Sequence, residues 1–242
     1  MGLMNMNTRE QDPIGQAILD FTKSKKPFDI IVKADLCDDD IIPIETLFRS
    51  FEEMPKLEQK AMQLCKGKIL DVGACAGPHS RYLSDSGFNV SAIDTSPGAV
   101  LYLNEIGINA HQVDFFHFQP KEQYDTILLL MNGLGIAGTL ANLEQTLLKA
   151  KSLLKPGGQI LCDSSDVKFL YEEEDGSYWM DLNAQYYGEF KFKMSYKKIE
   201  GPWFDWLYVD YDKLHKAASN CGFKSAKIED QEHHYLAQLI LT

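Results

Sequence analysis

The chain has 242 residues, of which 45% are hydrophobic, and it carries a formal net charge of −11 at pH 7. This length suits one large α/β domain with an insertion or a small cap better than two full domains. The acidic balance disfavours binding to phosphate backbones, which depends on clustered Lys and Arg, so we expect no nucleic-acid partner.

Two further features predict a cytoplasmic protein with no membrane partner. No apolar run approaches the roughly 20 residues of a membrane-spanning helix, and Met1–Glu10 lacks the apolar core of a signal peptide. The five cysteines include no C-x-x-C pair and no metal-site spacing, which predicts reduced thiols and no bound metal. Nothing in the sequence indicates the oligomeric state.

Residues 1–66 are predicted to form an N-terminal helical cap. Asp12 followed by proline has the pattern of an N-cap with proline at the first helical position, and apolar residues then recur at helical spacing. Pro43–Phe51 and Pro55–Cys65 predict two more helices. The remaining residues, 67–242, are predicted to form a single α/β domain.

The stretch Lys68–Ser80 predicts a strand, a tight turn and a helix. A short apolar run ends at Asp71, as expected of a strand buried in a parallel sheet. Gly73 and Gly77 allow a sharp bend and the close approach of a ligand, and Pro78 fits the first position of a helix. We interpret the stretch as a nucleotide-binding turn; glycines that serve packing alone are the alternative.

This turn departs from the dinucleotide fingerprint G-x-G-x-x-G. That fingerprint requires glycine at positions 75 and 78, where the chain has Cys75 and Pro78. A pyrophosphate relies on free backbone amides at the helix N-terminus, and proline removes one of them. The pattern therefore disfavours an NAD-dependent oxidoreductase.

Asp71, Gly73 and Gly77 match the pattern D-x-G-x-G-x-G, with Cys75 in place of the middle glycine. In this the stretch resembles the first motif of class I (Rossmann-like) S-adenosylmethionine (SAM) dependent methyltransferases. The resemblance implies a doubly wound, seven-stranded, mostly parallel sheet with an antiparallel edge strand. It also implies SAM as the cofactor and S-adenosylhomocysteine (SAH) as the product.

Two later strands end in acidic residues. Asn89–Asp94 completes a βαβ unit, and Asp94 is predicted to accept hydrogen bonds from the ribose hydroxyls; an N-cap for the helix near Pro97 is the alternative. Asp114 and Phe115 follow the third strand, where the resemblance places the adenine. A loop Asp beside a core phenylalanine explains that pair equally well.

The fourth strand, Tyr124–Met131, leads into Asn132 and Gly133 at the predicted switch point of the sheet. Amino-group methyltransferases of DNA carry N/D-P-P-Y/F at this place, so the departure favours a small-molecule acceptor. The passage Leu140–Asp163, with its L-K-P-G-G run, is similar to the family's fourth helix and fifth strand. The resemblance thus covers residues 67 to 163.

An insertion at about 165–209 precedes the closing helix Asp210–Cys221 and an antiparallel strand pair. Aromatic residues alternate with other residues in two runs on either side of Gly201-Pro202, where we expect the turn of a β-hairpin. We interpret the insertion as a lid over the substrate, although simple packing is the alternative. Its candidate substrate-contacting residues are Tyr187, Trp203 and Trp206, with Tyr178 and Trp179 upstream.

The resemblance implies a set of cofactor contacts: Asp71, Gly73, Ala74, Cys75, Gly77, Asp94, Thr95, Asp114, Phe115, Met131, Asn132 and Gly133. Methyl transfer is an in-line displacement in which positioning supplies most of the rate, and an acidic site suits the positive sulfonium. The candidates for a general base are His79, Asp205 and Tyr186. We therefore expect a methyltransferase acting on a small molecule; a non-catalytic SAM-binding protein is the alternative.

Overall fold

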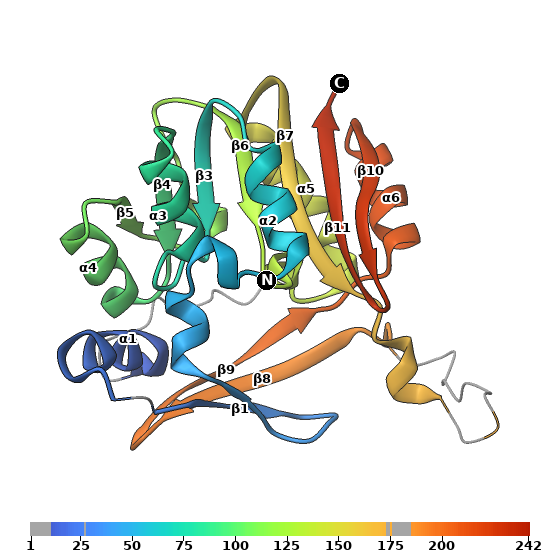
Figure 1. Cartoon of the computed structure of the whole chain (residues 1–242). Helices are drawn as coiled ribbons and strands as arrows, with labels where there is room; N and C mark the ends of the chain where they lie inside the picture. The colour runs from blue at the N-terminus through green and yellow to red at the C-terminus, as the bar shows by residue number, and fades with distance from the viewer. Residues whose placement is uncertain (1–10, 27, 173–174, 176–184) are drawn as a thin grey trace.

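Figure 1 shows the computed structural model, which describes residues 11–26, 28–172, 175 and 185–242. Tyr178 and Trp179 lie outside the described residues. The large sheet has the strand order β10-β11-β7-β6-β3-β4-β5, and β11 runs antiparallel to both of its neighbours. This confirms the predicted seven-stranded Rossmann-like sheet. Its strands are β3 (Lys68–Val72), β4 (Asn89–Asp94), β5 (Asn109–Gln112), β6 (Tyr124–Leu129), β7 (Leu154–Ser165), β10 (Phe223–Gln231) and β11 (His234–Leu241).

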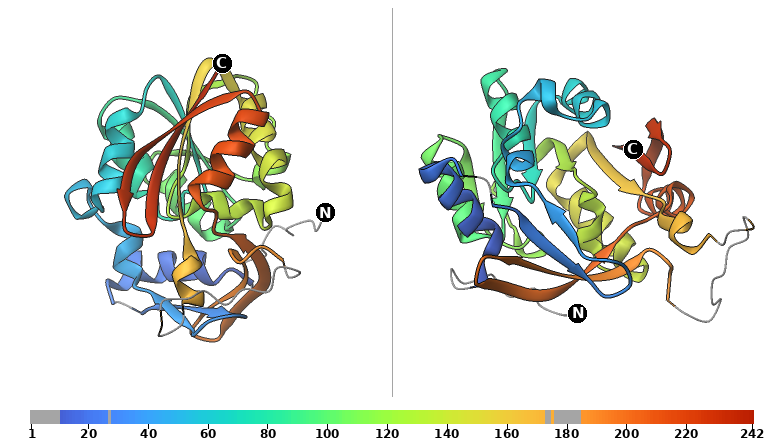
Figure 2. Two further views of the ribbon diagram at one scale, coloured as in Figure 1. Left: turned by 90° about the vertical axis from the view of Figure 1, so that its right-hand side faces the viewer. Right: turned by 60° about the horizontal axis from the view of Figure 1, so that its bottom comes forward.

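Helices cover both faces of this sheet (Figure 2, left). Successive strand residues point to opposite faces, so Ile69 of β3 packs in a different apolar cluster from Leu70. The cluster with Ile69 includes Leu57 of α2 and Leu83 of α3. The helices are α2 (Lys56–Leu64), α3 (Pro78–Asp85) and α4 (Pro97–Glu105) on one face, with α5 (Leu143–Leu153) and α6 (Tyr211–Asn220) on the other. None of the described helices is long and apolar enough to span a membrane.

A second sheet of four strands, ordered β2-β1-β8-β9, crosses the carboxyl edge of the large sheet (Figures 1 and 2). Its strands are β1 (Ile30–Ala34), β2 (Asp40–Ile42), β8 (Glu189–Tyr196) and β9 (Ile199–Leu207). The prediction of an all-helical N-terminal cap was therefore wrong for β1 and β2. The β-branched run Ile30–Val32 belongs to β1, whose residues Ile31–Ala34 pair with β8 of the insertion, and this long-range partner favours the extended conformation.

The β8–β9 hairpin is confirmed, but its turn is Lys197-Lys198, because Tyr196 pairs directly with Ile199. Lys197 takes the positive φ of 53° that such a short turn needs. The predicted turn residue Pro202 lies inside β9. Proline is tolerated there because β9 is an edge strand.

The N-terminal helices are partly as predicted. Helix α1 (Pro13–Ser24) is capped by Asp12, and α2 is confirmed. The helix expected at 43–51 is replaced by two short 3₁₀ helices, η2 (Ile44–Phe48) and η3 (Phe51–Glu53). Arg49, between them, is extended, which separates the two turns.

Helix α1 docks against the N-terminus of α4 through Asp12. The buried Asp12 carboxylate accepts hydrogen bonds from Gly15 N at 2.9 Å, Ser96 Oγ at 2.8 Å and Gly98 N at 2.9 Å. A Cβ on Gly98 would lie 2.6 Å from backbone atoms of Gly15, so glycine allows the two helices to touch. The N-terminal segment is thereby fixed beside the end of β4.

Candidate functional site

The turn after β3 leaves open space at one glycine and close packing at another. A Cβ on Gly73, where φ is 71°, would meet no atom within 4 Å. One on Gly77, where φ is 72°, would lie 2.4 Å from the Leu103 side chain on α4. The first glycine thus leaves room where a ligand can lie against the backbone, and the second fits α3 beside α4.

Cys75 occupies the left-handed region with a φ of 49°, which favours the glycine usual at this place in the motif. Its backbone N–H donates to Asp94 Oδ2 at 2.8 Å. Burial raises the pKa of the thiol well above its ordinary value, and the negative charges of Asp94 and Asp71 act in the same direction. The thiol is therefore protonated and unsuited to nucleophilic attack.

Asp94 lies at the end of β4 with both carboxylate oxygens engaged by backbone amides. Oδ2 accepts from Cys75 N, and Oδ1 accepts from Ser96 N at 2.8 Å. Burial raises the pKa of Asp94 to about 6 despite these bonds. The N-cap of α4 is Ser96, whose Oγ accepts from Ala99 N, so the capping role considered for Asp94 belongs to Ser96.

Asp71 is 2% exposed and accepts a 2.6 Å hydrogen bond from Ser80 Oγ on α3. Burial raises the pKa of its carboxyl group. This bond fixes the first turn of α3 to the end of β3. Asp71 therefore shapes the glycine turn from within.

Asp114 follows β5 and caps η4 (Phe115–His117). Its Oδ1 accepts from Phe116 N at 2.8 Å and lies 3.2 Å from His117 Nδ1. Phe115 is 5% exposed and its ring belongs to the core of the large sheet. The side chain of Phe115, which was predicted to contact the adenine, thus points into the core of the large sheet.

Met131 and Asn132 follow β6 with consecutive positive φ angles of 63° and 56°. Such residues cost of order 1–3 kcal/mol each and cluster at functional sites. Asn132 Oδ1 accepts from Ser165 Oγ at 2.9 Å, and Gly133 N donates to Asp163 Oδ1 at 3.3 Å. The end of β7 therefore holds the strained segment in place.

A buried acid–histidine pair at this edge was missed from the sequence. Asp163 is fully buried at the end of β7, and its Oδ2 lies 2.8 Å from His234 Nε2 at the start of β11. The two residues pair because β11 runs antiparallel beside β7. The sequence signal for this pair is the acidic residue Asp163 at the end of the apolar part of β7, as at Asp71 in β3 and Asp94 in β4.

His234 makes a pH-dependent contribution to stability. Its hydrogen bond with Asp163 raises its pKa above the ordinary 6.5, Glu58 acts in the same direction, and burial opposes both. A raised pKa in the folded state gives stability that is fully present below 6.5 and is lost as pH rises through the raised value. We expect His234→Gln to lose most stability relative to wild type at about pH 5 and progressively less above about pH 7. Urea unfolding across this range measures the difference, and a difference independent of pH would contradict the pairing.

The three candidate bases do not converge. His79 is 5% exposed, with Nε2 lying 2.7 Å from Glu58 Oε2. Tyr186 donates to Asp210 Oδ2 at 2.7 Å, and burial raises the pKa of its hydroxyl group. Asp205 lies on the exposed part of β9, opposite Lys191. Two of the candidates are therefore engaged in protein contacts.

The hairpin presents five ring-bearing residues on one side, here called the aromatic face: Phe190, Phe192, Phe204, Trp206 and Tyr208. Successive ring pairs among them have centroids 5.5 to 6.3 Å apart. The ring of Trp206 packs on Gly135 in η5 (Gly133–Ala137), where a Cβ would lie 2.0 Å from the indole.

Trp203 and Asp205 lie on the opposite side of the hairpin from the aromatic face. They pair with Lys193 and Lys191, and Trp203 is 52% exposed. Strand alternation thus puts Trp203 and Asp205 on the other side of β9 from Trp206, since both differ from it by an odd number of positions. Tyr187 instead donates to Asp166 Oδ1 at 2.9 Å, at the base of the insertion.

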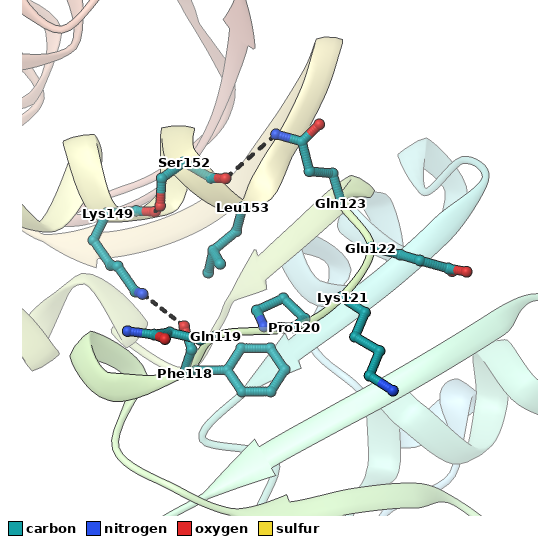
Figure 3. Close-up of a pocket in the computed structure, with 9 residues that line it drawn as sticks. All are labelled: Phe118, Gln119, Pro120, Lys121, Glu122, Gln123, Lys149, Ser152 and Leu153. Atoms are coloured by element: carbon teal, nitrogen blue, oxygen red, sulfur yellow. Dashed lines mark hydrogen bonds between the residues drawn. The ribbon is translucent and has the colours of Figure 1, made fainter.

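A surface hollow of about 230 Å³ lies elsewhere, at the amino end of β6 (Figure 3). Lys149 Nζ donates to the Phe118 carbonyl at 2.6 Å across it, and Gln123 Nε2 donates to the Ser152 carbonyl at 3.3 Å. Ligands of parallel α/β sheets bind at the carboxyl ends of the strands. We therefore place the functional site at the opposite edge from this hollow.

Comparison with known proteins agrees with this geometry. A family profile described as a methyltransferase domain matches residues 44–224. The structure of a SAM-dependent methyltransferase from Bacteroides fragilis in complex with SAH is 43% identical, with a TM-score of 0.90 over 98% of each chain. Among proteins with curated descriptions, none matches the sequence. The chain belongs to the SAM-dependent methyltransferase family, and its cofactor is SAM.

More distant structures share the fold. CalS10, an amino pentose methyltransferase from Micromonospora echinaspora, is 16% identical, with a TM-score of 0.54 over 82% of this chain and 96% of that chain. The sugar N-methyltransferase KedS8 from Streptoalloteichus sp. is 14% identical, with a TM-score of 0.56 over 86% and 97% of the two chains.

The environment of Cys75 predicts that its thiol is dispensable. Cys75→Gly removes a protonated side chain and relieves a left-handed backbone, so SAH affinity should stay within about tenfold, roughly 1.4 kcal/mol. Calorimetry with SAH, beside a turnover assay, measures both properties. Loss of turnover with unchanged SAH binding would show that the thiol takes part in the reaction.

Proposed function

We propose that the protein transfers the methyl group of SAM to a small-molecule acceptor held between the carboxyl edge of the large sheet and the aromatic face. This proposal rests on the β8–β9 hairpin, which extends from the turn after β3 to η5 after β6. At one end Tyr196 lies in the same apolar cluster as Ala76 in the turn after β3, and at the other Trp206 packs on Gly135 after β6. The half-buried rings of Phe192 and Phe204 lie between these two contacts.

The described residues fit SAM along this edge. Asp94 is proposed to accept the ribose hydroxyls, because each oxygen has one backbone donor and a carboxylate oxygen can accept more than one. The amino-acid part of SAM is proposed to cross the open space at Gly73 toward Met131. The adenine is proposed to lie near Asp114 and the backbone of η4, with Ala74 and Thr95 lining the cofactor site.

Electrostatics supports the same arrangement. SAM supplies an electrophilic methyl group on a positively charged sulfur. The carboxyl groups of Asp71, Asp94 and Asp114 are all buried near the ends of their strands, which favours a cation over a pyrophosphate. The chain's own part in the reaction is to align acceptor, methyl and sulfur and to exclude water with the aromatic face.

A small acceptor is proposed because the second sheet lies across the edge where a polymer would have to enter (Figure 2, right). The sequence Asn132-Gly133 also lacks the N/D-P-P-Y/F pattern of enzymes that methylate nucleobase amines. The similar folds include methyltransferases of an amino pentose and of a sugar nitrogen, so amino sugars form the first set of acceptors to test.

Trp206 and Trp203 form a matched pair for testing the acceptor site, since both are tryptophans of β9 on opposite sides. Trp206→Ala should lower kcat/KM for the acceptor by about tenfold to a hundredfold, through lost apolar contact and water exclusion. Trp203→Ala should leave kcat/KM nearly unchanged. SAH affinity should stay within about tenfold in both variants. Equal effects of the two substitutions would contradict the proposed position of the acceptor.

A further inference from the structure

Arg49 has an unpaired donor in a buried position. The residue is 7% exposed, and its Nε is the single buried side-chain nitrogen or oxygen without a hydrogen-bond partner in the part of the chain that the structure describes. A buried N–H without an acceptor is costly, and such groups are normally paired with protein, ordered water or a bound molecule.

The rest of the guanidinium group is fixed by the protein. Nη1 donates to the Thr46 carbonyl, and Nη2 donates to Glu58 Oε2 on α2. The same Glu58 oxygen lies 2.7 Å from His79 Nε2, at the start of α3. Contacts with η2 and α2 therefore hold both Nη atoms of the guanidinium, and Nε is its one nitrogen atom without a partner.

Arg49 lies close to the glycine turn. Leu47 and Phe48 of η2, which precede Arg49, pack in one cluster with Cys75 and Ala76 of the turn. The positive charge of Arg49 also acts on the Cys75 thiol, where it favours the ionised form against the stronger effect of burial. The guanidinium thus stands beside the turn over which the cofactor is proposed to run.

The negative charge of the cofactor's α-carboxylate suits a position beside Arg49. SAM and SAH carry an α-amino acid whose carboxylate needs a cationic or N–H donor, while the groups buried near the strand ends are carboxylates. Of the Lys and Arg side chains that the structure describes, Arg49 alone is buried. Arg binds carboxylates through directed N–H bonds, which its fixed plane orients.

We propose that Arg49 Nε–H binds the α-carboxylate of SAM and SAH, with Glu58 and His79 holding the guanidinium in position. This inference rests on the use of SAM as the cofactor. It makes the N-terminal segment between η2 and η3 part of the cofactor site.

The test compares SAH with its decarboxylated analogue, S-adenosyl-3-thiopropylamine, by calorimetry. The wild type should bind SAH at least tenfold more tightly than the analogue. The double variant Arg49→Gln/Glu58→Gln removes both charges without leaving a lone buried carboxylate, and its preference for SAH should fall below about threefold. Its affinity for the analogue should stay near that of the wild type, which also shows that the site is folded.

Two further variants complete the test. Glu58→Gln keeps Arg49 and an acceptor oxygen for Nη2, so it should lower the preference for SAH less than the double variant does. Arg49→Lys keeps the charge, removes the Nε–H and should reduce the preference at least threefold. A wild type that binds both ligands equally would overturn the proposal, as would an Arg49 variant that loses both ligands in parallel. A wild type that binds neither ligand would instead contradict the cofactor assignment itself.

Discussion

Asp94→Ala is expected to weaken SAH binding by about 1.5–3 kcal/mol, the scale of hydrogen bonds to a charged group. The proposed ribose hydroxyls then lose their acceptor, and Cys75 N and Ser96 N lose theirs. Calorimetry measures the change, with Asp85→Ala on the exposed end of α3 as a control that should leave affinity unaltered. Unchanged affinity in Asp94→Ala would remove Asp94 from the cofactor site.

The pH dependence of SAH binding tests the same residue independently. Burial raises the pKa of Asp94 to about 6, and ribose donors favour its ionised form, so binding below that pH requires release of a proton. SAH affinity should therefore rise about tenfold per pH unit as pH increases toward 6 and then level off. In Asp94→Asn this rise should disappear. A wild-type affinity that does not change between about pH 5 and 7 would contradict the assignment.

Asp12→Ala is expected to lower the free energy of unfolding by about 3–5 kcal/mol, because it leaves three buried donors without an acceptor. Those donors belong to α1 and to the first turn of α4, so the loss combines a helix cap with a contact between the helices. Urea unfolding measures the loss. Asp39→Ala, in an exposed loop, should change stability by less than about 0.5 kcal/mol. A loss below about 1 kcal/mol in Asp12→Ala would show that α1 is held by other contacts.

The parts of the fold predicted from the sequence are those in which neighbouring residues determine the structure. The turn at Gly73, the cap at Asp12 and the strand before Asp94 each carry their signals within a few residues. The β1 strand could not be predicted in this way. One of its two partners, β8, lies more than 150 residues later, and local periodicity does not report such pairing.

The same distinction applies to the candidate site. Asp163 and His234 form a pair only because β11 returns beside β7, and the partners of Arg49 come from η2 and α2. The hairpin was recognised from its alternation, and the same alternation puts Trp203 and Trp206 on opposite sides of β9, because three positions separate them. Their opposite orientations could therefore be predicted from the sequence, whereas the pairing of Asp163 with His234 depends on segments that are distant in the sequence.

The hairpin is also more than a removable lid. Strand β8 pairs with β1, and Tyr196 is buried among residues of α1 and η2. Leu207 is fully buried in the core of the large sheet. Deletion of the hairpin would thus expose two apolar cores, and substitutions on the aromatic face separate acceptor binding from folding more cleanly.

The central claim is transfer of the SAM methyl group to a small molecule. Its most direct test incubates the protein with methyl-labelled SAM and pools of small amines, amino sugars and hydroxy compounds, then follows SAH release and the label in the low-molecular-weight fraction. We predict SAH release that depends on one pool and label recovered in a small molecule of that pool. Label recovered in protein or nucleic acid, or tight SAH binding without transfer to any pool, would contradict the claim.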